Sequence, residues 1–110
     1  MYNLFVYTVI ETPEFIKWSA AVWSQGESDE FIAWISENPL SGEVIQGAGG
    51  LRKVRWSRAG SGKRGGARVI YFNRLAQGEI VLLLVYAKAK FDSLRPDFLL
   101  KLKERFHGKK

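Results

Sequence analysis

The residues with the clearest chemical potential in this sequence are basic side chains concentrated in one stretch. Residues 51–68 hold seven cations and no acidic residue, whereas residues 1–50 carry a net charge of −6. Like charges repel, so an unmixed block of this density predicts an anionic partner, and a solubility patch is the weaker alternative. We expect that partner to be nucleic acid. The seven cations are Arg52, Lys53, Arg55, Arg58, Lys63, Arg64 and Arg68.

A glycine-rich segment within this stretch, GSGKRGGAR at 60–68, could hold phosphate, but it does not fit a nucleotide cofactor. A Walker loop needs Ser or Thr after Gly-Lys and a helix behind it. Here Gly62-Lys63 precedes Arg64, and the following ARVIYF is rich in β-forming residues. We therefore expect the segment to connect two strands, and we expect no cofactor.

The same residue types limit what chemistry the protein could perform on a nucleic acid. With no cysteine and one histidine (His107, near the end and expected in an exposed tail), the sequence predicts no metal site. Arginine stabilises phosphate but stays protonated. Lys53 among neighbouring cations, or Tyr86, could transfer a proton. A non-catalytic nucleic-acid binder would need the same cations, so catalysis and binding without catalysis both stay open.

Strands are expected at four places, residues 2–9, 51–57, 67–73 and 79–88, where β-branched and aromatic residues dominate. The last of these runs is apolar on both sides, which predicts a central strand. If the other two late strands flanked it, their polar faces would meet its polar end.

Helices are expected between the first two strands and at the end of the chain. Thr12 and Pro13 predict the start of the first helix, ending near Gly26. Ser28 is the expected cap of the second, which should stop around 38–39. Tryptophans on both helices are expected in the core. Leu99, Leu102 and Phe106 recur at helical spacing in the last helix.

The resulting order is βααβββα, which predicts a small α+β domain with a mainly antiparallel sheet packed by helices. At 110 residues the chain is expected to be a single domain, 1–110. The N-terminus lacks a basic region before its apolar residues, and the longest apolar run, 80–87, is short for a membrane span. We expect a cytoplasmic protein.

Strand alternation sorts the candidate site residues by face. Lys53 and Arg55 lie opposite Val54 and Trp56, and Arg68 shares its face with Ile70 and Phe72. In the last strand, Leu82, Leu84, Tyr86 and Lys88 are expected on one side and Val81, Leu83 and Val85 on the other. The expected result is that Lys53, Arg55, Arg68, Tyr86 and Lys88 converge on one surface.

The string NPLSGEVIQGAGGLRKVRW, followed by GKRGGARVIYF and VYAKAK, resembles the RelE/HigB family of bacterial toxins over roughly residues 37–91. The resemblance implies a RelE-like fold and ribosome-dependent, metal-independent endoribonuclease activity on mRNA in the A site. It also implies that a cognate antitoxin, with a helix-turn-helix domain expected, neutralises the protein and blocks its effect on translation.

Carried over by position, the resemblance implies that Lys53, Arg55, Arg68 and Lys88 are catalytic, with Tyr86 as a further catalytic candidate. The expected RNA-binding residues around them are Arg52, Arg58, Lys63, Arg64 and Lys90. The sequence departs from the family pattern at Ala89, where an arginine is usual, and it has no tyrosine after Tyr86. The alternatives are a ParE-like toxin with another target and a non-catalytic nucleic-acid-binding module.

Overall fold

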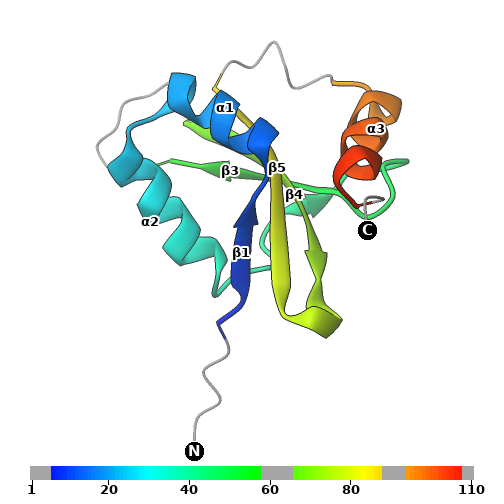
Figure 1. The fold of residues 1–110 in the computed structure, drawn as a ribbon, viewed down its shortest axis with the longest axis horizontal. Coiled ribbons are helices and arrows are strands. Elements are labelled where there is room, and N and C mark those ends of the chain that lie inside the picture. The colour runs from blue at the N-terminus through cyan, green and yellow to red at the C-terminus, as the bar shows by residue number, and fades with distance from the viewer. Residues whose placement is uncertain (1–5, 58–65, 88–93, 108–110) are drawn as a thin grey trace, which may run out of the picture.

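The computed structural model describes residues 6–57, 66–87 and 94–107, and within them it confirms the α+β class (Figure 1). The order is β1 (Thr8–Glu11), α1 (Pro13–Val22), α2 (Gln25–Ile35), β2 (Glu43–Val44), β3 (Arg52–Trp56), β4 (Ala67–Arg74), a 3-10 turn (Leu75–Gln77), β5 (Glu79–Tyr86) and α3 (Pro96–His107). The short strand β2 was not predicted. The first strand begins at Thr8, later than expected, and residues 1–5 lie outside the described part. No helix among the described residues is long and apolar enough to span a membrane.

The sheet is mixed, with strand order β1-β5-β4-β3-β2. β2, β3, β4 and β5 pair antiparallel in succession, whereas β1 pairs parallel with β5. The parallel pair is possible because α1 and α2 lead the chain away from β1 before it returns. The arrangement considered above, with β3 and β4 both flanking β5, is therefore not the observed one. β4 is the middle strand, and β1 occupies the second edge of β5.

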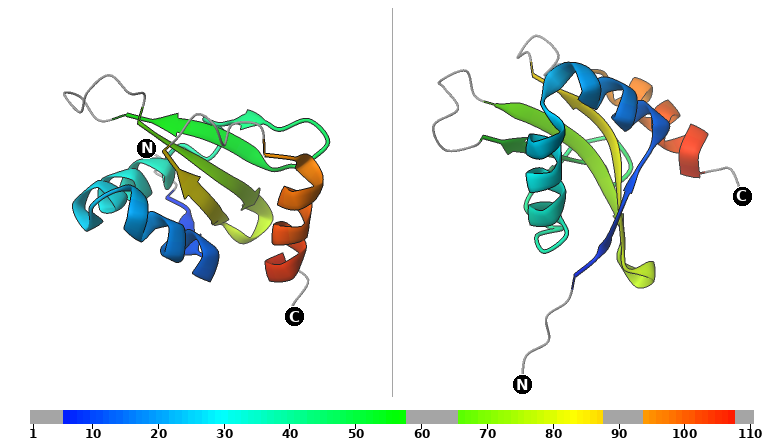
Figure 2. Two further views of the ribbon diagram at one scale, coloured as in Figure 1. Left: turned by 90° about the horizontal axis from the view of Figure 1, so that it is seen from above. Right: turned by 60° about the vertical axis from the view of Figure 1, so that its left-hand side comes forward.

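Helices cover both faces of the sheet, α1 and α2 on one and α3 on the other (Figure 2). The core beneath α1 and α2 contains Phe15, Phe31, Ile35, Val54, Ala67, Val69, Tyr71, Ile80, Leu82 and Val85. The core beneath α3 contains Ala48, Leu51, Ile70, Phe72, Val81, Leu83, Leu84, Tyr86, Leu99 and Leu102, with Phe106 packed against it. The predicted apolar positions of α3 are thus confirmed.

The helix starts show one correct and one wrong prediction. Thr12 caps α1 as expected, because its Oγ1 accepts a hydrogen bond from the Phe15 amide at 3.1 Å. Ser28 does not cap α2, which begins after Ser24 and includes a capping box with Glu27. Ser28 is instead buried within the helix. The S-x-x-E pattern at 24–27 is a recognised start signal that the prediction overlooked.

A β-bulge in β5 breaks the alternation expected for this strand. Ile70 of β4 opposes Leu84 but Tyr71 opposes Leu82, so Leu83 is an extra residue in β5. As a result Leu82 faces α1 and α2, whereas Leu83 and Leu84 both face α3. The expectation that Leu82 shares a face with Leu84 and Tyr86 is wrong, because the bulge shifts the pleat between them.

Candidate functional site

Backbone register brings four of the predicted site residues to one face of the sheet. Arg55 of β3 opposes Arg68 of β4, and Arg68 opposes Tyr86 of β5. Lys53 lies two residues along β3 and therefore points to the same side. We call the surface formed by Lys53, Arg55, Arg68 and Tyr86 the site face. It lies on the α3 side of the sheet, since Tyr86 belongs to the core beneath α3.

Arg68 occupies the centre of the site face and is held closely by the fold. Arg68 is 7% exposed. Its Nη1 donates long hydrogen bonds of 3.4 Å to the carbonyls of Gly66 and Ala87. Gly66 has φ +66°, and a Cβ there would collide with the Trp56 carbonyl oxygen. Glycine at 66 therefore lets β4 start close against the end of β3. This contact fixes where the Arg68 side chain begins.

A hollow of about 410 Å³ adjoins these cations. It is lined by Ser41, Glu43, Lys53, Val54, Arg55 and Arg68. A volume of this order falls within the range of small-molecule sites, roughly 300–1,000 Å³. Glu43 opposes Lys53 across β2 and β3, so the hollow combines a carboxylate with three cations.

Sequence reasoning missed Glu43 because it assigned no strand between the second helix and residue 51. A signal was present in the glycine-rich segment between Val44 and Arg52, since two β-forming runs joined by a glycine-containing turn are typical of a hairpin. The Ile45 amide donates to the Leu51 carbonyl at 2.8 Å, and Gly47, Gly49 and Gly50 all have positive φ. The turn therefore brings Glu43, from the acidic residues 1–50, beside the basic strand β3.

Arg52 lies apart from the other predicted cations. It opposes Tyr71, which belongs to the core beneath α1 and α2, so it points away from the site face. Its Nη1 donates to the Gly42 carbonyl at 2.6 Å and to the Leu40 carbonyl at 3.4 Å. In this position Arg52 fixes the loop that carries Ser41 and Glu43. Arg52 is therefore not part of the site face, and its role in RNA binding stays a prediction.

Tyr71 holds the same loop from the middle strand. Its hydroxyl donates to the Pro39 carbonyl at 2.8 Å and accepts from the Gly42 amide at 2.9 Å. A Cβ at Gly42 would lie 2.9 Å from the Tyr71 hydroxyl oxygen and 3.0 Å from the Lys53 carbonyl oxygen. The loop can approach β3 and β4 this closely because residue 42 is glycine. The wall of the hollow is thus part of the rigid fold.

Five predicted site residues lie outside the described part of the chain: Arg58, Lys63, Arg64, Lys88 and Lys90. Their roles stay predictions. Among the described residues no group of three or more His, Cys, Asp or Glu side chains could hold a metal ion.

The tryptophans on the helices lie in or beside the core, as expected. Trp34 packs on Trp56 with ring centroids 5.0 Å apart, and Phe31 contacts both rings. This aromatic cluster lies on the side of α1 and α2, opposite the site face.

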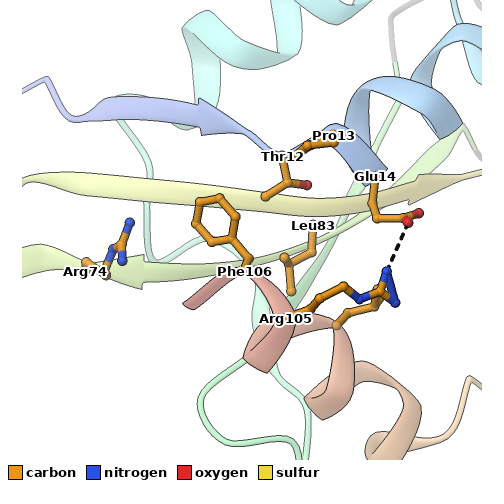
Figure 3. Close-up of a pocket in the computed structure, with 8 residues that line it drawn as sticks. Thr12, Pro13, Glu14, Arg74, Leu83, Arg105 and Phe106 are labelled. Atoms are coloured by element: carbon orange, nitrogen blue, oxygen red, sulfur yellow. Dashed lines mark hydrogen bonds and ion pairs between the residues drawn. The ribbon is translucent and has the colours of Figure 1, made fainter. Parts of the chain in front are cut away.

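A second cavity, of about 520 Å³, lies where α1, β5 and α3 meet (Figure 3). Its charged groups are engaged with one another or with neighbours, since Glu14 pairs with Arg105 at 3.5 Å and Arg74 pairs with Glu79 at 3.0 Å. Leu83 and Phe106 contribute apolar surface to it. We interpret this cavity as a gap in the packing of α3 against α1 and β5.

No protein-family model matches this chain. Solved structures do match. The toxin RelE of E. coli, in a double arginine-to-alanine mutant in the free state, shares 13% identity at a TM-score of 0.57, covering 79% of this chain and 88% of that one. The RelBE2 toxin–antitoxin complex of Mycobacterium tuberculosis gives 19% identity and a TM-score of 0.60, covering 79% of this chain and 97% of that one. The chain therefore has a RelE-like fold, and these structures do not distinguish the HigB branch.

Proposed function

We propose that this protein is a toxin that cleaves mRNA on the ribosome and is neutralised by an antitoxin. The observation that carries the proposal is the row Arg55–Arg68–Tyr86, with Lys53 beside it, on one face of a RelE-like sheet. Three cations side by side on rigid strands suit a polyanion, because their repulsion is relieved when a phosphodiester lies among them.

The chemistry expected of this face is attack by a ribose 2′-hydroxyl on the adjacent phosphorus. Arg55 and Arg68 would hold the phosphate and stabilise the charge that builds on it, because a guanidinium can donate two parallel hydrogen bonds. Lys53 and Tyr86 are the members of the site face that can give or take a proton. The products would be a 2′,3′-cyclic phosphate and a 5′-hydroxyl.

We expect dependence on the ribosome because the site face contains few groups that can transfer a proton. Positioning can supply several orders of magnitude of rate when a template holds the reacting groups in place. An enzyme with cations and few proton-transfer groups gains most from such a template. We therefore expect cleavage only where mRNA is being translated.

The antitoxin partner is proposed from the fold likeness and from charge. The RelBE2 structure is a toxin–antitoxin complex. On this chain, a free cationic surface would associate non-specifically with RNA, so a covering partner of acidic or mixed charge is expected. We propose that it carries a helix-turn-helix domain and is encoded beside the toxin.

The test is controlled expression in bacteria, with mRNA ends mapped by primer extension. Growth should stop because translation stops, cuts should map to translated messages, and co-expression of the neighbouring reading frame should restore growth. Rapid cleavage of naked RNA by low concentrations of purified protein would contradict ribosome dependence. Arrest of DNA supercoiling in place of translation would favour a ParE-like target, and RNA binding without cut ends would favour a non-catalytic module.

A further inference from the structure

The hollow beside the site face contains the one kind of group that the basic strands lack, a carboxylate able to accept a proton. We propose that Glu43 is the general base of the cleavage reaction, an inference that rests on the proposed function. Its role comes from its place in the sheet, beside Lys53 and Arg68 of the site face.

Register fixes the position of Glu43 relative to the cations. Glu43 opposes Lys53, Lys53 opposes Ile70, and Ile70 shares its face with Arg68. Neighbouring strands lie about 4.8 Å apart and same-face residues about 6.6 Å apart along a strand, so the Cα atoms of Glu43 and Arg68 are separated by roughly 12 Å. One nucleotide phosphate with its ribose fits between two side chains at that separation. Both residues line the same hollow, which supports a shared substrate.

The surroundings of Glu43 leave its carboxylate accessible. The residue is exposed, and it lies on the two-residue edge strand β2. The loop before it is fixed by Arg52 and Tyr71, both bonded to Gly42. An exposed carboxylate on a held backbone can approach a bound ribose without being buried as an unpaired charge, which would be costly.

The proposed step balances as follows. Glu43 accepts the proton of the 2′-hydroxyl as the bond from O2′ to phosphorus forms. The bond from phosphorus to O5′ breaks, and the leaving oxygen takes a proton from the Lys53 ammonium. Arg68 stays protonated throughout and stabilises the phosphorane charge. Because Glu43 and Lys53 oppose each other, the proton can then pass from the carboxylic acid to the lysine amine, which restores both groups.

The experiment compares Glu43→Gln with the unaltered protein in single-turnover cleavage of mRNA on programmed ribosomes. Removing a general base should lower the cleavage rate about 10²- to 10⁴-fold. Affinity for the ribosome complex should be unchanged or slightly higher, because the variant loses one negative charge. The matched control is Glu11→Gln, the same change at an exposed position on β1, the opposite edge of the sheet, which should cleave at the unaltered rate.

The pH profile separates a base from a residue that only positions Lys53. The rate of the unaltered protein should fall as pH is lowered and the carboxylate is protonated, and Glu43→Gln should lose this acidic limb. A slow variant that keeps the limb would overturn the inference, as would a variant within twofold of the unaltered rate. Absence of cleavage by the unaltered protein would instead overturn the proposed function itself.

Discussion

Replacing Arg68 by alanine tests the central residue of the site face. Arg68 is flanked by Arg55 on one strand and by Tyr86 on the other. It is the most buried cation of the face, at 7% exposure. A phosphate held over the middle strand would meet this guanidinium first. Arg68→Ala should therefore affect the reaction more than a change at another residue of the site face.

The expected loss of activity follows from the kind of contact removed. A preformed donor aimed at developing charge contributes about 10²- to 10³-fold in rate, or roughly 2.7–4 kcal/mol. We therefore expect Arg68→Ala to lower single-turnover cleavage by about 100-fold or more. Arg68→Lys should recover only part of the rate, because an ammonium cannot make the two parallel hydrogen bonds of a guanidinium.

The expected loss of stability is smaller. The bonds from Arg68 to the carbonyls of Gly66 and Ala87 are both 3.4 Å long, beyond the usual 2.7–3.2 Å of an N–H···O bond. Each should contribute no more than about 1 kcal/mol. For a domain of this size 1 kcal/mol corresponds to roughly 4–8 °C in Tm. The variant should thus stay folded at assay temperature.

The assay needs a control that loses an arginine from the same strand and face. Arg74 meets this need, because it lies six residues along β4, about 20 Å away, and pairs with Glu79 at 3.0 Å. Arg74→Ala should lower Tm by a comparable amount and leave cleavage intact. A folded Arg68→Ala protein that cleaves at the unaltered rate would refute the reasoning, and an unfolded one would show that Arg68 is mainly structural.

Three further predictions concern the site face and the elements that support it. Thr12→Ala removes the α1 cap and the 2.8 Å hydrogen bond to the Leu82 carbonyl, and should cost about 1–3 kcal/mol in denaturant unfolding, whereas Thr12→Ser should cost less. Tyr71→Phe leaves the Pro39 carbonyl and Gly42 amide without their shared hydroxyl, and should lower both Tm and cleavage rate; unchanged cleavage would show that the loop does not need this anchor. Binding of single-stranded RNA should weaken with salt with a log–log slope near −2 if the three cations of the site face each contact one phosphate, and a salt-independent affinity in filter binding would contradict that.

Sequence alternation predicted the site face correctly where a strand has one polar and one apolar side. In β3, charged Lys53 and Arg55 alternate with Val54 and Trp56, so only one arrangement buries the apolar pair. The same reasoning failed in β5, which is buried on both faces. In β5, moving the alternation by one residue still places an apolar residue at every position. The residue types around Leu83 therefore gave no sign of the bulge.

Glu43 shows a different limit of sequence reasoning. Counting charge along the chain placed the acids in one half and the cations in the other, which made the basic stretch look free of carboxylates. The hairpin at 45–51 returns the chain so that Glu43 opposes Lys53, only ten positions later in sequence. A charge count follows the order of residues in the sequence. Strand pairing instead places residues side by side that are several positions apart in the sequence. Any acid within one hairpin of a basic strand should therefore be considered part of its site until the pairing is known.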